Sequence, residues 1–76
     1  MRLLLGGYLP FFASKHQEQI EVSLKEPARL KEVLFKLGIP VSDVYLTVLN
    51  GDLVTLDETV VSDSDEVRLY PPIDGG

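Results

Sequence analysis

One segment of the sequence has the periodicity of a helix, and it lies between segments that have the periodicity of strands. Its apolar positions form a single stripe: Leu30, Val33, Leu34 and Leu37. Glu26-Pro27 is expected to open this helix, because the missing N–H of a proline would be unpaired in the first turn anyway. Gly38 followed by Pro40 indicates its end. One helix must bury its stripe against other elements, so we expect the strands to supply the other wall of a core.

The strand predictions come from alternation and from turn residues. The predicted strands are residues 2–8, 19–24, 44–49, 53–56 and 66–70. The first two are expected to pair as an antiparallel hairpin, and Asn50-Gly51 is a strong signal for a second hairpin, because both residues tolerate positive φ. Residues 57–65 read as an acidic loop, with Val60 and Val61 anchoring it to the core. The order predicts an α+β fold, a single mixed sheet packed over one main helix.

Alternation along the strands assigns side chains to two faces of the sheet. The predicted core residues of the sheet are Leu3, Leu5, Ile20, Val22, Leu24, Leu46, Val48, Val67 and Leu69. The opposite, open face is predicted to present Leu4, Tyr45, Thr47, Leu49, Arg68 and Tyr70. An exposed apolar and aromatic patch of this kind is typical of a partner-binding surface. The alternative is that loops such as residues 9–13 cover part of it.

Length, charge and cysteine content restrict the class of function. The 76 residues make one domain, with a boundary expected between residues 1–72 and a tail of residues 73–76. The formal net charge of −5 argues against nucleic acid or an anionic membrane as the main partner and favours a more basic protein surface. The chain has no cysteine, which excludes disulfides and thiol chemistry and suits the cytoplasm.

No residue pattern in the chain indicates catalysis or a metal site. His16 is the sole histidine and lies in a polar turn, where a solvated side chain is expected. The acidic residues of 57–66 do not match a calcium-loop spacing, and they are expected to form a solvated face that could also steer docking on a basic partner. There is no P-loop and no Ser/His/Asp set. The chain is therefore not expected to be an enzyme on its own.

The carboxyl end carries a resemblance to a known family. The relevant segments are LGIP at residues 37–40, VLNGDLV at residues 48–54 and SDSDEVRLYPPIDGG at residues 62–76. With these segments the chain resembles the ubiquitin-like β-grasp fold and, more narrowly, the MoaD/ThiS family of sulfur-carrier proteins. The pair Pro71-Pro72 is more like MoaD, the small subunit of molybdopterin synthase. Two departures from the family pattern are Ser64, where a glycine is usual, and Gly6-Gly7, where bulkier residues are usual.

The resemblance implies a function for the tail. The Gly76 carboxylate would be adenylated and then converted to a thiocarboxylate that donates sulfur in molybdopterin (molybdenum cofactor) biosynthesis. Ile73, Asp74 and Gly75 would thread a narrow channel in a partner, as a flexible Gly-Gly tail. Pro71 and Pro72 would stiffen its exit from the domain, because proline fixes φ.

The same resemblance implies the partners. They would be a MoeB/ThiF-like adenylating enzyme, a sulfur-donating enzyme, and either a MoaE-like molybdopterin synthase large subunit or a thiazole synthase. No cofactor would be bound permanently, and ATP would be used by the activating enzyme. The alternatives are sulfur transfer to thiamin or another product, conjugation to proteins as a ubiquitin-like modifier, and, in a different class, a β-grasp interaction module without sulfur transfer.

Overall fold

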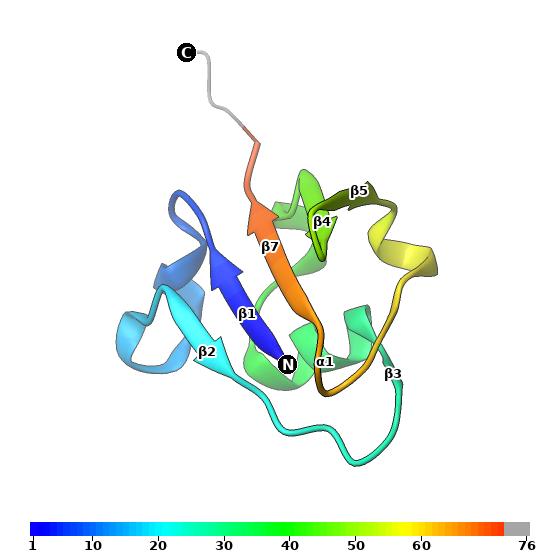
Figure 1. Cartoon of the computed structure of the whole chain (residues 1–76). Helices are drawn as coiled ribbons and strands as arrows, with labels where there is room; N and C mark the ends of the chain where they lie inside the picture. Colours follow the sequence, from blue (N-terminus) through cyan, green and yellow to red (C-terminus); the bar gives the residue numbers. More distant parts are fainter. Residues whose placement is uncertain (73–76) are drawn as a thin grey trace.

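A computed structural model of the chain describes residues 1–72, so the predictions made for Ile73, Asp74, Gly75 and Gly76 lie outside the described residues. The main sheet has five strands, namely β1 (Arg2–Leu5), β2 (Gln19–Glu21), β4 (Leu46–Leu49), β5 (Asp52–Val54) and β7 (Glu66–Tyr70). Their order is β2-β1-β7-β4-β5, and only the β1–β7 pair is parallel. The mixed sheet packed on one main helix confirms the predicted fold class (Figure 1).

A second, two-stranded sheet and several 3-10 turns complete the described chain. The small sheet pairs β3 (Ala28–Arg29) with β6 (Val60–Val61). The 3-10 turns are η1 (Leu9–Phe12), η2 (Ser14–His16), η3 (Val41–Asp43) and η4 (Leu56–Glu58). The turn η4 shortens the predicted return strand at residues 53–56. Of the two valines expected to anchor the acidic loop, Val61 is buried and Val60 is exposed.

The helix α1 (Leu30–Leu37) begins three residues later than Pro27. Ala28 and Arg29 are extended instead, because they pair with β6 and the Leu30 N–H donates to the Thr59 carbonyl at 3.0 Å. The predicted end is confirmed. Gly38 has φ of 80°, in the left-handed region that glycine tolerates.

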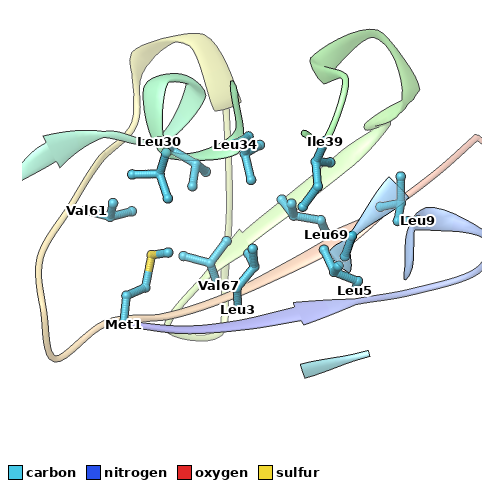
Figure 2. Close-up of a cluster of buried hydrophobic side chains, with 12 residues drawn as sticks. Met1, Leu3, Leu5, Leu9, Leu30, Leu34, Ile39, Val61, Val67 and Leu69 are labelled. Carbon is cyan, nitrogen blue, oxygen red and sulfur yellow. The ribbon is translucent and has the colours of Figure 1, made fainter. Parts of the chain in front are cut away.

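The core lies between α1 and the main sheet. Figure 2 shows Leu30 and Leu34 of the helix facing Leu3 and Val67 of the central strands. The predicted core residues that are buried, or partly buried against the core, are Leu3, Leu5, Ile20, Val22, Leu24, Val67 and Leu69. The helix stripe is confirmed too, since Leu30, Val33 and Leu34 are buried and Leu37 packs beside them.

The predicted facing of β4 is wrong by one residue. Thr47 lies opposite Leu69 and is 3% exposed, whereas Leu46 lies opposite Tyr70 and is 38% exposed. Leu49 likewise packs against the core, and Val48 lies opposite Arg68 on the open face. The cause is the pattern Leu-Thr-Val-Leu, which has apolar residues on both faces of the strand. Alternation alone therefore does not determine which side chains of β4 face the core.

The turn at Ser64 needs no glycine. Ser64 is not among the residues with positive φ. The Asp65 N–H donates to the Ser62 carbonyl at 3.1 Å, and the Asp65 carboxylate accepts the Ser62 N–H at 2.7 Å. This reciprocal pair closes a turn of a kind that tolerates ordinary residues, which explains the serine.

Candidate functional site

The central strand β7 leads the chain out of the domain at Pro71 and Pro72 (Figure 1). β1 runs parallel to β7, so the residues that follow β1 lie at this end of the sheet. β4 runs antiparallel to β7, so the residues that precede β4 lie here too. The Tyr45 N–H donates to the Tyr70 carbonyl at 2.7 Å, and the Gly6 N–H donates to the Leu69 carbonyl at 2.8 Å. The last residues of β7 are therefore held from both sides.

Gly6 and Gly7 allow the loop after β1 to pass very close to this exit. A Cβ at Gly6 would lie 2.8 Å from Cδ1 of Tyr70. A Cβ at Gly7 would lie 2.6 Å from Cγ of Pro71, and Gly7 also has φ of +52°. Side chains at either position would push against the tyrosine or proline ring. The unusual Gly6-Gly7 pair is thus accounted for by close packing against the base of the carboxyl end.

An exposed apolar surface surrounds the same exit, and we call it the Tyr70 surface. Its residues are Gly7, Tyr8, Tyr45, Leu46, Tyr70, Pro71 and Pro72, which line a hollow of about 400 Å³. Tyr45 is 68% exposed and Tyr8 is 46% exposed. Rigid aromatic side chains that combine apolar area with a polar tip are enriched where proteins bind one another. The geometry suits a partner that covers the exit of the carboxyl end.

Tyr8 is fixed at the edge of the Tyr70 surface. Its hydroxyl donates to Oδ1 of Asp43 in η3 at 2.8 Å. Its ring meets that of Phe12 edge to face, with centroids 6.1 Å apart. These contacts join the loop after β1 to the segment that precedes β4, so the two sides of the hollow are tied together.

Three of the six residues predicted for the open face lie there, two face the core, and Tyr45 is an exposed residue that precedes β4. Tyr45, Arg68 and Tyr70 are exposed and Leu4 is half-buried opposite Arg68. Thr47 and Leu49 face the core, because the facing of β4 is shifted by one residue from the prediction. Neither residue therefore presents its side chain to a partner on this face. Leu46 and Val48 take their places. The partner-binding role of the exposed residues stays a prediction.

The open face is polar away from the Tyr70 surface. Arg2 pairs with Glu21 at 3.3 Å, and Arg68 pairs with Glu66 at 3.3 Å. Exposed ion pairs of this kind contribute little to stability. They leave the sheet face divided into a charged part at the start of β1 and β7 and an apolar part at the end of β7.

The acidic loop uses two of its carboxylates to close turns. Hydrogen bonds from the Asn50 amide and the Ser62 N–H lower the pKa of Asp65 below its ordinary value. The Leu24 N–H, followed by the amino group of Met1 at 3.7 Å, lowers the pKa of Asp63. Both shifts have the same cause, because these partners favour the charged form of the carboxyl.

Within residues 1–72, no group of three or more His, Asp or Glu side chains is arranged to hold a metal ion. His16 is exposed, and its ring stacks on Phe11 with centroids 5.1 Å apart. In the same part of the chain, no helix is long and apolar enough to cross a membrane.

The sequence did not point to Tyr8 or to the role of the two glycines before it. Tyr8 was assigned to the first strand, which ends at Leu5 instead. The signal available was the run Gly-Gly-Tyr followed by Leu9-Pro10, since paired glycines mark a close backbone approach. Which segment they approach is set by the parallel pairing of β1 with β7, and local patterns do not reveal that.

A parallel central pair, antiparallel outer strands and one helix across the sheet define a ubiquitin-like β-grasp domain. The chain belongs to the Mut7-C ubiquitin family, whose model matches residues 8–74. This match supports the predicted ubiquitin-like fold without selecting the MoaD/ThiS branch. No curated protein matches the chain.

Proposed function

We propose that this ubiquitin-like domain is a sulfur carrier that presents its carboxyl end to partner enzymes docked on the Tyr70 surface. The observation that carries the proposal is the position of that surface. Exposed aromatic residues surround the point where β7 passes into Pro71 and Pro72, four residues before Gly76. A partner bound there receives the carboxyl end without any further rearrangement of the domain.

The chemistry of the proposal needs no nucleophile in this chain. The Gly76 carboxylate would attack the α-phosphate of ATP on an adenylating enzyme of the MoeB/ThiF kind, forming an acyl-adenylate and releasing pyrophosphate. Hydrosulfide would then attack the carbonyl carbon and displace AMP, leaving a thiocarboxylate. The sulfur would pass to a precursor held by a MoaE-like large subunit in molybdopterin biosynthesis. The catalytic side chains would belong to these cytoplasmic partners.

Two features of the described residues support this reading. The close packing of Gly7 on Pro71 and the hydrogen bonds at Tyr45 and Gly6 fix the direction in which the chain leaves the sheet. Fixing that direction lowers the entropy lost when a partner takes up the carboxyl end. Pro-Pro followed two residues later by Gly-Gly supplies the sequence part of the argument.

The test is the intact mass of the full chain after incubation with ATP, a MoeB/ThiF-like enzyme from the same organism and sulfide. We expect replacement of one oxygen by sulfur, located at Gly76 by fragmentation. The matched control is the chain without Gly76, which should bind the enzyme and gain no sulfur. An unchanged mass of the full chain, with an enzyme that loads its own established carrier, contradicts the proposal.

Other acceptors and another class of function give different outcomes in the same system. Transfer to a thiazole synthase product would assign the carrier to thiamin, and an isopeptide bond to a lysine would make the chain a protein modifier. A pure interaction module would bind its partner through the Tyr70 surface and keep its activity without Gly75 and Gly76. Comparing binding with sulfur loading in the truncated chain separates that module from a carrier.

A further inference from the structure

A second exposed apolar surface lies on the helix side of the domain, between the end of α1 and η3. We call it the Phe35 hollow, a depression of about 670 Å³. The residues on which the inference rests are Lys31, Phe35, Lys36, Ile39, Pro40 and Val41. None of them belongs to the Tyr70 surface.

The exposure of Phe35 has no explanation in the fold. Its side chain is 84% exposed, although the neighbouring Leu34 is fully buried. Val41 across the hollow is 44% exposed. A single exposed apolar side chain is ordinary. Phe35 and Val41, however, line the same hollow, and the buried Ile39 forms part of its wall. Together they make a continuous apolar surface, which is typical of an interaction site.

The hollow is preformed, because both of its walls are fixed by hydrogen bonds. The Ile39 N–H donates to the Leu34 carbonyl at 3.0 Å, which closes the end of α1. The Asp43 N–H donates to the Pro40 carbonyl at 3.0 Å and holds η3. Ile39 joins these walls to the core (Figure 2). Binding to such a surface loses little conformational entropy on the side of the domain.

The charge around the hollow differs from that of the whole chain. The chain has a net charge of −5, but the hollow is lined by two lysines and one glutamate, Glu32. Lys31 precedes Phe35 by four residues and so lies on the same face of the helix, and Lys36 also lines the hollow. Within residues 1–72 neither lysine forms an ion pair. Their charges are therefore available to an anionic partner.

We propose that the Phe35 hollow is a second docking site, which binds an acidic peptide segment through one apolar side chain. The apolar side chain would pack on Phe35 and Val41, and flanking carboxylates would pair with Lys31 and Lys36. Charge complementarity selects this occupant, because a basic segment would face the two lysines. The site is independent of the proposed sulfur chemistry, so peptide binding can be tested separately from sulfur loading.

The test is a fluorescence anisotropy titration of the full chain against a short labelled peptide with two leucines between glutamates. We expect saturable binding that weakens as salt is raised. A matched peptide with lysines in place of the glutamates should not bind. Amide chemical-shift changes should centre on Phe35 and Val41.

Two variants in the hollow test where the peptide binds, and two variants elsewhere control for the loss of a phenylalanine and for the change in net charge. Phe35→Ala should weaken binding about tenfold or more, equivalent to about 1.4 kcal/mol, and the double variant K31E/K36E should do the same. Phe11→Ala removes another exposed phenylalanine, and K15E/K25E changes the net charge equally; both should leave the affinity unchanged. Thermal melts of all variants keep a loss of fold from being read as a loss of binding.

Several outcomes would overturn the proposal. They are equal affinity for the acidic and basic peptides, undiminished binding by Phe35→Ala, and shift changes confined to the Tyr70 surface. Absence of binding at any peptide concentration would overturn it as well. Self-association of the chain that disappears in Phe35→Ala would assign the hollow to a second copy instead.

Discussion

A Cβ added to Gly7 would lie 2.6 Å from Cγ of Pro71, closer than real side chains approach one another. The contact joins the loop after the first strand to the residue that follows the last strand. The loop and the prolines together therefore set the direction in which the chain leaves β7. Predictions about Gly7 and about the Tyr70 surface follow from it.

Gly7→Ala should destabilise the domain more than Gly51→Ala. Both glycines have positive φ, which costs an alanine about 1–2 kcal/mol in either place. Only Gly7 meets a neighbour, since nothing lies within 4 Å of a Cβ at Gly51. The overpacking should add about 1–3 kcal/mol, measured by urea unfolding. Equal losses in the two variants would mean that Pro71 moves aside freely.

Leu34→Ala should cost about 2–5 kcal/mol of stability, because Leu34 is fully buried between α1 and the sheet. Phe35→Ala is the matched control one residue along the same helix. Its exposed ring contributes little to folding, so its free energy of unfolding should stay close to that of the unchanged chain. Reversed effects would show that the helix presents its other face to the sheet.

Tyr45→Ala should weaken docking of the activating enzyme and leave the stability of the domain nearly unchanged. The side chain is 68% exposed on the Tyr70 surface, and a central aromatic contact is worth about 1–2 kcal/mol or more in affinity. The measurement is a binding titration paired with a thermal melt. Val60→Ala, an exposed side chain away from this surface, is the control. Docking that tolerates Tyr45→Ala and Tyr70→Ala alike would place the interface elsewhere.

The stability of the domain should fall as the pH drops below about 4. Hydrogen bonds lower the pKa of Asp65 in the folded chain, so its contribution is fully present above the ordinary value of about 3.9. It is lost as the pH falls toward the lowered folded value, because the unfolded chain then takes up the proton first. Asp65→Asn should flatten this acid dependence in urea titrations. Asp57→Asn removes one carboxylate without removing a side-chain hydrogen bond within residues 1–72, so it is the control for the change in net charge.

Removing Gly76 should abolish sulfur loading while changing partner affinity by less than about tenfold, or about 1.4 kcal/mol. The reason is that docking is assigned to the Tyr70 surface and the chemistry to the carboxylate. One residue added after Gly76 should have the same effect, because it displaces the carboxylate by about 3.5 Å. Loading assays and binding titrations on both variants decide the matter. Sulfur loading that survives either change would refute the carrier mechanism.

The sequence predicted the elements of the fold better than their boundaries. The helix stripe at Leu30, Val33 and Leu34 and the hairpin at Asn50 are encoded locally, so periodicity and turn residues were enough. The start of α1 was missed, because pairing of Ala28 with Val61 overrides the local preference of Pro27 to begin a helix.

The candidate site was predicted in part for a related reason. Arg68 and Tyr70 followed from alternation in β7, which has an unambiguous pattern, whereas Tyr45 is exposed because it precedes β4. Thr47 was misplaced, because β4 carries apolar residues on both faces and its phase is set by pairing with β7. Tyr8 is held at the surface by a hydrogen bond to Asp43, 35 positions away in sequence. Contacts at that separation leave no local pattern.

The pairing of β1 with β7 also dictates when the domain can fold during synthesis. Arg2 lies beside Glu66 and Leu5 beside Leu69, so β1 can pair with β7 only after the helix and strands between them have been synthesised. Joining β1 to β7 closes a loop of nearly the whole chain, which is slow compared with local pairing. A nascent chain without β7 lacks the central strand of the sheet. Leu3 and Leu34 then lack the core residues Val67 and Leu69. The Tyr70 surface, which includes Tyr70 of β7 and residues of the loop after β1, can therefore form only after β7 has been synthesised.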